Sequence, residues 1–180
     1  EHATTTGTHN SLVKVDDDTY LLAYAAGSSG GVIKSFTIAS GNMFPTISSS
    51  PTVTTNEDTQ YAFSVSDFNY FDLDQDALDH IEVTSLETTG ALYLDADNDD
   101  THDSGEDVTA NQDITASNIT NGHLRFAPAA NANGDPYTTF AYKVNDGDDY
   151  SSSASTMTID VTAVNDAPIV SSAPTGTTNE

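Results

Sequence analysis

Pro168-Ile-Val-Ser-Ser-Ala-Pro-Thr-Gly-Thr-Thr-Asn-Glu180 repeats an earlier stretch of the same chain, Pro45-Thr-Ile-Ser-Ser-Ser-Pro-Thr-Val-Thr-Thr-Asn-Glu57. Nine of the thirteen positions are identical, at a constant offset of 123 residues. A long self-match at a fixed offset indicates a tandem repeat. The chain is therefore predicted to contain one whole unit, residues 45–167, followed by the first strand of a next unit, residues 168–180.

Within residues 45–167, short runs of alternating apolar and polar residues are separated by turn signals. The runs are Tyr61-Ala-Phe-Ser-Val65, Ile81-Glu-Val83, Ala91-Leu-Tyr-Leu94, Leu124-Arg-Phe126, Phe140-Ala-Tyr-Lys-Val144 and Met157-Thr-Ile-Asp-Val161. Period-two alternation places one face of a strand in the core and the other in water. About seven such strands in about 120 residues are typical of a two-sheet sandwich. We therefore expect an all-β fold without a long helix.

Residues 1–44 also have a β pattern, with short strands separated by the turn residues Asp16-Asp-Asp18 and Gly27-Ser-Ser-Gly-Gly31. Three short strands do not make a stable domain alone, so this segment needs a packing partner. Two resemblances compete. The stretch from His9 to Tyr24 resembles one repeat of the propeller-like arrays of large secreted bacterial proteins. The stretch from Tyr20 to Pro45 is similar to the last hairpin of the unit that follows it.

The composition is strongly acidic, with 28 Asp and Glu against four Lys and Arg, and a formal net charge of −24. Such a chain lacks the cationic surface that nucleic acids and anionic membranes require. So much negative charge also opposes a compact fold unless it is spread through solvent or neutralised by cations. The acids fall in spaced clusters, which favours divalent cations as the counter-charge.

The sharpest cluster is Asp95-Ala-Asp-Asn-Asp-Asp-Thr-His-Asp-Ser-Gly-Glu106. Numbered as a twelve-residue loop, it places oxygen-bearing residues at the ligand positions of an EF-hand loop. The predicted ligands at positions 1, 3, 5, 7, 9 and 12 are Asp95, Asp97, Asp99, Thr101, Asp103 and Glu106. Two positions depart from that pattern, because Asp100 replaces the turn glycine and His102 stands at position 8. We expect a Ca²⁺ site here, at the end of a strand and without the flanking helices.

The order of several short motifs across two thirds of the chain resembles the bacterial cadherin-like tandem repeats of large secreted adhesins. The matching motifs are Thr55-Asn-Glu-Asp-Thr59, Phe71-Asp-Leu-Asp-Gln-Asp-Ala-Leu78, Thr88-Thr-Gly-Ala-Leu-Tyr-Leu94, Leu124-Arg-Phe-Ala-Pro-Ala-Ala-Asn131, Phe140-Ala-Tyr-Lys-Val-Asn-Asp-Gly147 and Val161-Thr-Ala-Val-Asn-Asp-Ala-Pro168. The resemblance implies an Ig/cadherin-like Greek-key β-sandwich, arranged end to end, with calcium at the joints and a role in adhesion or surface structure.

The same resemblance implies two further groups of calcium ligands. Asp72, Asp74 and Asp76, with Asp146, would face the joint upstream of the unit. Glu57 would join Asn165 and Asp166 at the downstream joint. The upstream joint itself reads Asn42-Met-Phe-Pro45 and lacks the Asp that follows Asn165 downstream.

The leading functional hypothesis is a calcium-stiffened structural or adhesive module, repeated end to end in an extracellular bacterial surface protein or fibre. Its expected partners are neighbouring repeats and, by β-strand addition, other copies of the chain. The alternative is a carbohydrate-binding sandwich, for which Tyr70, Tyr137 and Tyr150 are the plausible surface rings. Enzymatic activity is not expected, because the sequence contains no recognisable nucleophile–base arrangement and no phosphate-binding loop.

Overall fold

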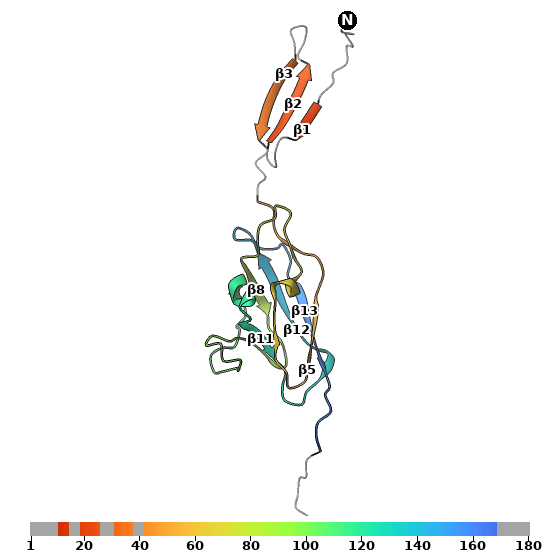
Figure 1. The fold of residues 1–180 in the computed structure, drawn as a ribbon, viewed down its shortest axis with the longest axis vertical. Coiled ribbons are helices and arrows are strands. Elements are labelled where there is room, and N and C mark those ends of the chain that lie inside the picture. The colour runs from red at the N-terminus through yellow and green to blue at the C-terminus, as the bar shows by residue number, and fades with distance from the viewer. Residues whose placement is uncertain (1–10, 15–18, 26–30, 38–41, 169–180) are drawn as a thin grey trace, which may run out of the picture. The chain divides into compact units, whose positions relative to one another are not determined.

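The computed structural model describes residues 11–14, 19–25, 31–37 and 42–168 (Figure 1). The chain divides into two compact units, Glu1–Met43 and Phe44–Glu180. The stretch predicted as the first strand of a next repeat, residues 168–180, lies outside the described residues except for Pro168.

The first unit contains one antiparallel sheet of three strands in the order β1-β2-β3. The strands are β1 (Ser11–Lys14), β2 (Thr19–Ala25) and β3 (Gly31–Thr37). Leu12 pairs with Leu22, and Leu22 pairs in turn with Lys34. The two β patterns that the sequence places before Gly27 and the one after it therefore form a simple meander.

The second unit is built on a five-stranded sheet and a three-stranded sheet. The larger sheet has the order β10-β8-β12-β13-β5, and in Figure 1 its long strands β8, β12 and β13 run through the unit. Its strands are β5 (Thr52–Asn56), β8 (His80–Ser85), β10 (Gln112–Thr115), β12 (Gly134–Asn145) and β13 (Ser155–Thr162). All neighbours in it are antiparallel except β13 and β5, which are parallel.

The smaller sheet has the order β6-β11-β9 and is antiparallel throughout. Its strands are β6 (Tyr61–Ala62), β9 (Ala91–Leu94) and β11 (Leu124–Ala127). The chain enters the unit through β4 (Thr46–Ile47), which pairs with β7 (Tyr70–Phe71) as a two-stranded ribbon. Directly after β4 the chain crosses to the larger sheet as β5.

The core lies between the two sheets and is formed by the alternating residues that the sequence places there. Ile81, Val83, Phe140, Tyr142 and Ile159 come from the larger sheet and are fully or almost fully buried. From the smaller sheet, Leu92, Leu124 and Phe126 join the same cluster. Burying apolar surface at about 25 cal/mol per Å² makes this cluster the main source of stability.

One predicted strand is shorter than its alternation suggests. Tyr61, Phe63 and Val65 are expected on one strand, but β6 ends at Ala62, and a 3₁₀ helix, η2, spans Val65–Phe68. Asp67 closes that helix as a capping box, because its carboxylate accepts the backbone N–H of Ser64 at 2.8 Å. The helix buries Phe68 against Phe63 and Tyr142.

Among its described residues, the second unit has one short α-helix, α1 (Ala116–Thr120), whose N-terminus is capped by the Thr115 side chain. The described parts of the chain are otherwise strands, turns and loops, so the expectation of an all-β fold is confirmed. Among the described residues, no helix is both long and apolar enough to span a membrane.

Candidate metal centres

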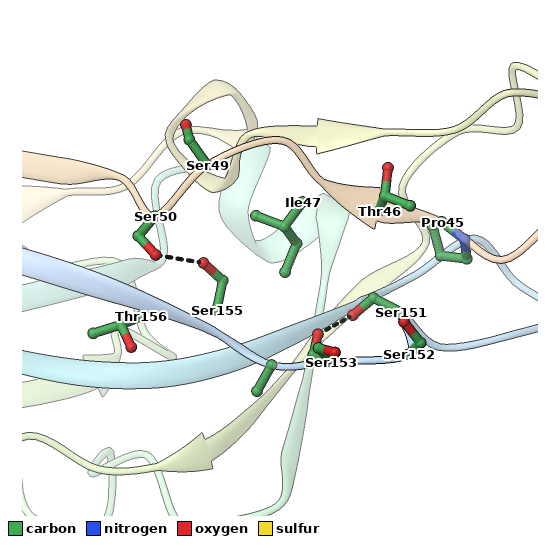
Figure 2. Close-up of a pocket in the computed structure, with 11 residues that line it drawn as sticks. Pro45, Thr46, Ile47, Ser49, Ser50, Ser151, Ser152, Ser153, Ser155 and Thr156 are labelled. Carbon is green, nitrogen blue, oxygen red and sulfur yellow. Dashed lines mark hydrogen bonds between the residues drawn. The ribbon is translucent and has the colours of Figure 1, made fainter.

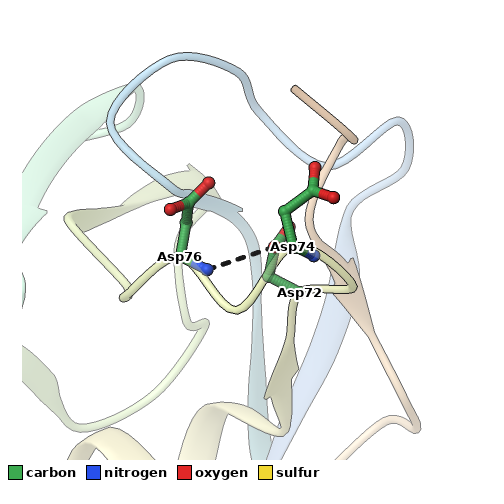
Figure 3. A group of neighbouring side chains, drawn as sticks. All are labelled: Asp72, Asp74 and Asp76. Carbon is green, nitrogen blue, oxygen red and sulfur yellow. Dashed lines mark hydrogen bonds between the residues drawn. The ribbon is translucent and has the colours of Figure 1, made fainter. Parts of the chain in front are cut away.

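The loop after β7 brings Asp72, Asp74 and Asp76 together, as Figure 3 shows. One carboxylate oxygen from each of the three lies within 4.8 Å of the others. Asp72 is buried, with 7% of its surface exposed, and its Oδ1 accepts the backbone N–H groups of Asp74 and Asp76 at 2.7 and 3.3 Å. Gln75 takes a left-handed conformation with φ of 70°. The turn thus folds the three acids onto one side of the loop.

The negative charge in this loop is concentrated and only partly solvated. Partial desolvation and the carboxylates of Asp72 and Asp146 raise the pKa of Asp76. Burial, followed by the charge of Asp72, raises the pKa of Tyr70 to about 12. The second oxygen of Asp72, Oδ2, is buried and has no hydrogen-bond partner among the described residues. A buried oxygen left in this way costs free energy that a bound cation would recover.

The loop that starts at Asp95 makes the same turn. Asp95 is completely buried, and its Oδ1 accepts the backbone N–H of Asp99 at 3.2 Å. Asn98 has φ of 60°, in the place that Gln75 takes in the first loop. One carboxylate oxygen from each of Asp95, Asp97 and Asp99 lies within 4.8 Å of the others. Two Asp-x-Asp-x-Asp segments therefore form matching triads.

In this loop the backbone turns once more at Asp100, the residue that replaces the glycine of the EF-hand pattern. Asp100 has φ of 63°, and its N–H donates to Oδ2 of Asp95 at 3.1 Å. The sharp turn that position 6 of such a loop requires is therefore made here by an aspartate.

Glu106 closes the loop. Its carboxylate accepts the N–H groups of Ala96 and Asp103 at 2.8 and 2.9 Å, and its backbone carbonyl accepts the N–H of Leu94. The two ends of the loop are thereby joined below the triad. Glu106 and Asp103 also lie close enough to Asp97 for their charges to act on it.

Inside the loop, the two exposed carboxylates of the triad, Asp97 and Asp99, are in different electrostatic states. The neighbouring carboxylate of Asp99 is the main cause that raises the pKa of Asp97. The hydroxyl of Thr101 hydrogen-bonds to Asp99 and lowers the pKa of that group. As the pH falls, Asp97 is therefore protonated before Asp99. A bound dication would relieve the repulsion between the two carboxylates.

Arg125 on β11 is a participant in this loop that sequence reasoning did not single out. Its Nε lies 3.3 Å from Oδ2 of Asp95, and its Nη2 contacts Oδ1 of Asp100. It is the single arginine of the sequence. Arg125 pairs across the sheet with Tyr93, two residues before the loop begins. Only the strand register, which the sequence does not reveal, places it there.

Glu57 is buried, and its carboxylate is hydrogen-bonded to the chain where it leaves β13. Its Oε1 accepts the backbone N–H of Val164 at 2.5 Å, and Oε2 lies 3.4 Å from Nδ2 of Asn133. Asn165 and Asp166 follow directly and are exposed. Glu57 thus lies next to the backbone of its predicted partners, with Asn133 as a neighbour that sequence reasoning missed.

The structure brings some of the thirteen predicted ligands close to one another and leaves others apart. The two triads are brought together, and the charge of Asp146 acts on Asp76 from the loop between β12 and β13. Asp103, Thr101 and Glu106 lie in the second loop around its triad. Within the part of the chain that the structure describes, Glu57, Asn165 and Asp166 do not form a third compact acidic group.

A groove of about 440 Å³ lies between residues 45–50 and the start of β13 (Figure 2). It is lined mainly by hydroxyl side chains, and Ser50 and Ser155 hydrogen-bond across it at 3.3 Å. The described lining residues are uncharged, so the groove offers hydroxyl groups rather than the carboxylates that the two loops offer.

The three tyrosines predicted as surface rings all use their hydroxyl groups within the protein. Tyr70 donates to the carbonyl of Asp76, and Tyr150 donates to Asp113 and also contacts His80. The Tyr137 hydroxyl accepts the N–H of Ala129. The carbohydrate-binding alternative stays a prediction without a further observation in its favour.

The donor sets of the two triads fit Ca²⁺ better than a softer metal. Both triads consist of carboxylate oxygens, which suit hard cations, and neither contains the nitrogen or sulfur ligands that zinc prefers. Each triad has one buried aspartate fixed by backbone N–H groups and two more accessible ones. In the first triad the unpartnered Oδ2 of Asp72 is a further sign of fit.

No family model matches the sequence, and no curated protein matches it. Among solved structures, the chain is similar to an endo-fucoidan hydrolase of glycoside hydrolase family 107, at 15% sequence identity and a TM-score of 0.34. The match covers 90% of this chain and 23% of that enzyme's chain. A likeness at this TM-score assigns neither a fold family nor an activity.

Proposed function

We propose that this chain is a calcium-stiffened structural module, without enzymatic activity, of an extracellular bacterial surface protein or fibre. The observation that carries the proposal is the pair of matching triads. At 72–76 and at 95–99, a buried aspartate and two aspartates at i+2 and i+4 place their oxygens within 4.8 Å. Two separate loops with the same turn and the same donor set favour a common ligand, and Ca²⁺ matches that donor set.

When bound, a calcium ion supplies two positive charges that neutralise the carboxylates of a triad. The residues of the chain do the rest. Asp72 and Asp95 are held in place by backbone N–H groups, so they present oxygens with little freedom to lose. Asp74, Asp76, Asp97 and Asp99 are more accessible and complete the triads. An ion bound only by the folded loop stabilises that fold by mass action.

The position of the first triad supports a role in stiffening. Asp72 follows β7, whose partner β4 is the first strand after the chain enters the unit. Glu57 lies where the chain leaves β13. In an array of such units, ion ligands would therefore stand near both ends of each unit. At the millimolar calcium concentration of extracellular fluids, this arrangement would make a flexible array of units into a semi-rigid rod.

We further propose that the second unit has the Greek-key topology of the Ig/cadherin-like sandwich. The support is a five-stranded and a three-stranded sheet over one core, with the first part of the chain divided between β4 and β5. Neighbouring repeats are the proposed partners. A second mode is strand addition by another copy, since residues 168–180 repeat the sequence that forms β4 and β5.

The test is thermal unfolding in 2 mM calcium, in 2 mM magnesium and in chelator, with the size in solution recorded in each. These concentrations are on the order of the dissociation constants of extracellular calcium-binding modules, or somewhat above them. We expect calcium to raise the melting temperature by roughly 10 °C and magnesium to raise it far less. No difference between calcium and chelator would refute the proposal.

Two variants assign the effect to the loops. Asp74→Asn with Asp76→Asn should remove part of the calcium-induced rise, and Asp97→Asn should remove another part. Glu82→Gln is the matched control for Asp97→Asn, because it removes one negative charge from β8, where Glu82 stands opposite Lys143. If Glu82→Gln reduces the rise as much as the loop variants, the ion is screening overall charge and not binding the triads.

A further inference from the structure

We propose that Arg125 is a built-in counter-cation that sets the calcium affinity of the loop 95–106 and keeps that loop folded when no ion is bound. This inference rests on the proposed calcium binding. It assigns a role to a residue that is not itself a ligand. Removing Arg125 should strengthen calcium binding, although it also removes a contact that stabilises the calcium-free loop.

The geometry connects Arg125 to the buried end of the loop. Its Nε lies 3.3 Å from Oδ2 of Asp95, its Nη2 contacts Asp100, and its Nε also donates to the carbonyl of Gly122 at 3.0 Å. The Asp95 side chain is completely buried, and the side chain of Arg125 is 16% exposed. The guanidinium therefore meets the loop from the protein side, while the triad oxygens of Asp97 and Asp99 are on exposed residues.

The first loop is a natural comparison for this arrangement. Asp72 and Asp95 each begin an Asp-x-Asp-x-Asp turn, each is buried, and the Oδ1 of each accepts the N–H four residues later. The Oδ2 of Asp95 has Asp100 N–H and Arg125 as partners, whereas the Oδ2 of Asp72 has no hydrogen-bond partner in the part of the chain that the structure describes. The arginine is thus an added feature of the second loop and not a requirement of the turn.

Two effects follow from one positive charge in this place. In the calcium-free protein, Arg125 offsets the charge of Asp95 and Asp100, which would otherwise repel Asp97 and Asp99. In the calcium-bound protein, the same charge repels the ion across a short distance in a partly buried setting, where Coulomb interactions are weakly screened. Arg125 therefore lowers the free energy of the empty loop more than that of the loaded loop. The difference appears as weaker binding.

The opposing possibility is that Arg125 only holds the loop in shape. In that case its loss would disorder the ligands, so both the calcium-free stability and the calcium affinity would fall together. The proposal predicts changes of opposite sign in these two quantities. A purely structural role does not produce this signature.

The experiment is calorimetric calcium titration of the full chain at fixed ionic strength, paired with melting temperatures in chelator. Arg125→Gln should bind calcium at the loop roughly tenfold more tightly while its melting temperature in chelator falls. Arg125→Lys keeps the charge and should therefore stay closer to the parent affinity than Arg125→Gln does. Lys143→Gln removes one positive charge on β12 and is the control for net charge.

Equal or weaker binding by Arg125→Gln overturns the proposal, as does an equal gain in Lys143→Gln. Arg125→Gln could fail to fold in chelator. For that case, Asp100→Gly and Asp100→Gly with Arg125→Gln form a second pair, in which glycine relieves the positive-φ turn. The double variant should again bind more tightly than its parent. Calcium binding that Asp97→Asn leaves unchanged also overturns the proposal, because the ion then lies outside this loop. If the unmodified chain binds no calcium at all, the proposed function itself fails, which is a distinct result.

Discussion

In the loop 72–76, one oxygen of the buried Asp72 has no partner among the residues that the structure describes, whereas in the loop 95–106 the equivalent oxygen of Asp95 contacts Arg125. The two loops share a positive φ at the fourth residue, Gln75 in one and Asn98 in the other, and the loop 95–106 adds a second positive φ at Asp100. The same local sequence pattern therefore produces the same turn, because an Asp side chain at the first position accepts the N–H groups that follow. Neighbouring strands decide how the charge is balanced.

These two ways of balancing a buried charge imply that the stability of the two loops depends to different degrees on a bound ion. A buried carboxylate–arginine pair is costly to break, but it is stable without any added ion. A buried carboxylate with an unpartnered oxygen carries an unrecovered desolvation cost in the absence of a ligand. The loop 72–76 should therefore depend more on added calcium, and the loop 95–106 should depend more on its internal pair.

The largest expected effect is from Asp95→Asn measured in chelator. The substitution leaves Arg125 without its buried carboxylate, so we expect a loss of about 3 kcal/mol in the free energy of unfolding. Denaturant unfolding followed by circular dichroism measures it. Asp113→Asn on β10 is a suitable control, because Asp113 is an exposed acid that bonds to Tyr150. A loss below about 1 kcal/mol would mean that the Arg125–Asp95 pair contributes little.

Asp72→Asn should give a smaller effect in chelator and a clear one in calcium. The amide keeps an oxygen for the N–H groups of Asp74 and Asp76, and it removes a charge that forms no ion pair with the described residues. We expect the calcium-free stability to stay within about 1 kcal/mol of the parent. About 1–2 kcal/mol of the calcium-induced gain should be lost. A chelator-state loss as large as that of Asp95→Asn would erase the contrast between the two loops.

Much of the framework was predictable from the sequence. Alternation identified the buried faces of β8, β12 and β13, because Ile81, Tyr142 and Ile159 follow a period of two. It failed at Val65, since the capping box of Ser64 and Asp67 ends the strand pattern in a 3₁₀ helix. A side-chain cap competes locally with strand pairing, and alternation does not report it.

The candidate sites were predictable as ligand lists but not as balanced charge systems. The family resemblance grouped Asp72, Asp74 and Asp76, and the EF-hand-like spacing grouped Asp95, Asp97 and Asp99; the structure brings each group together. The position of Arg125 depends on the register of β11 against β9, in which Leu124 faces Leu94 and Arg125 faces Tyr93. Register is fixed by packing across the whole sheet, so a contact between distant residues is not visible in either segment by itself.

Acidity should affect the calcium-free protein through the two triads. The pKa values of Asp76 and Asp97 are raised in the folded state, so folding favours their protonated forms. Their contribution to stability is present below the ordinary Asp pKa of about 4 and is lost as pH rises through the raised values. In chelator and low salt, the melting temperature should therefore rise as pH falls from 7 towards about 4.5.

Two features sharpen this pH prediction. The pKa of Asp99 is lowered, so its contribution is lost at still lower pH and the rise should reverse there. Protons also compete with calcium, so the melting curves with and without calcium should converge in acid. Asp76→Asn with Asp97→Asn should flatten the rise in chelator. If that double variant keeps the full rise, other carboxyl groups, such as Asp160, cause it.

The smallest expected effect compares the two positive-φ residues that hold the turns. Gln75 has φ of 70° and Asn98 has φ of 60°, and glycine adopts such angles without steric cost. Because Asn tolerates this region better than Gln, Gln75→Gly should stabilise the calcium-free protein by about 0.5–1 kcal/mol and Asn98→Gly by only a few tenths. Chemical unfolding of both variants against the parent measures the difference. Equal gains would show that backbone strain is the same in both loops, and a loss at Gln75 would show that its side chain, not only its φ, supports the turn.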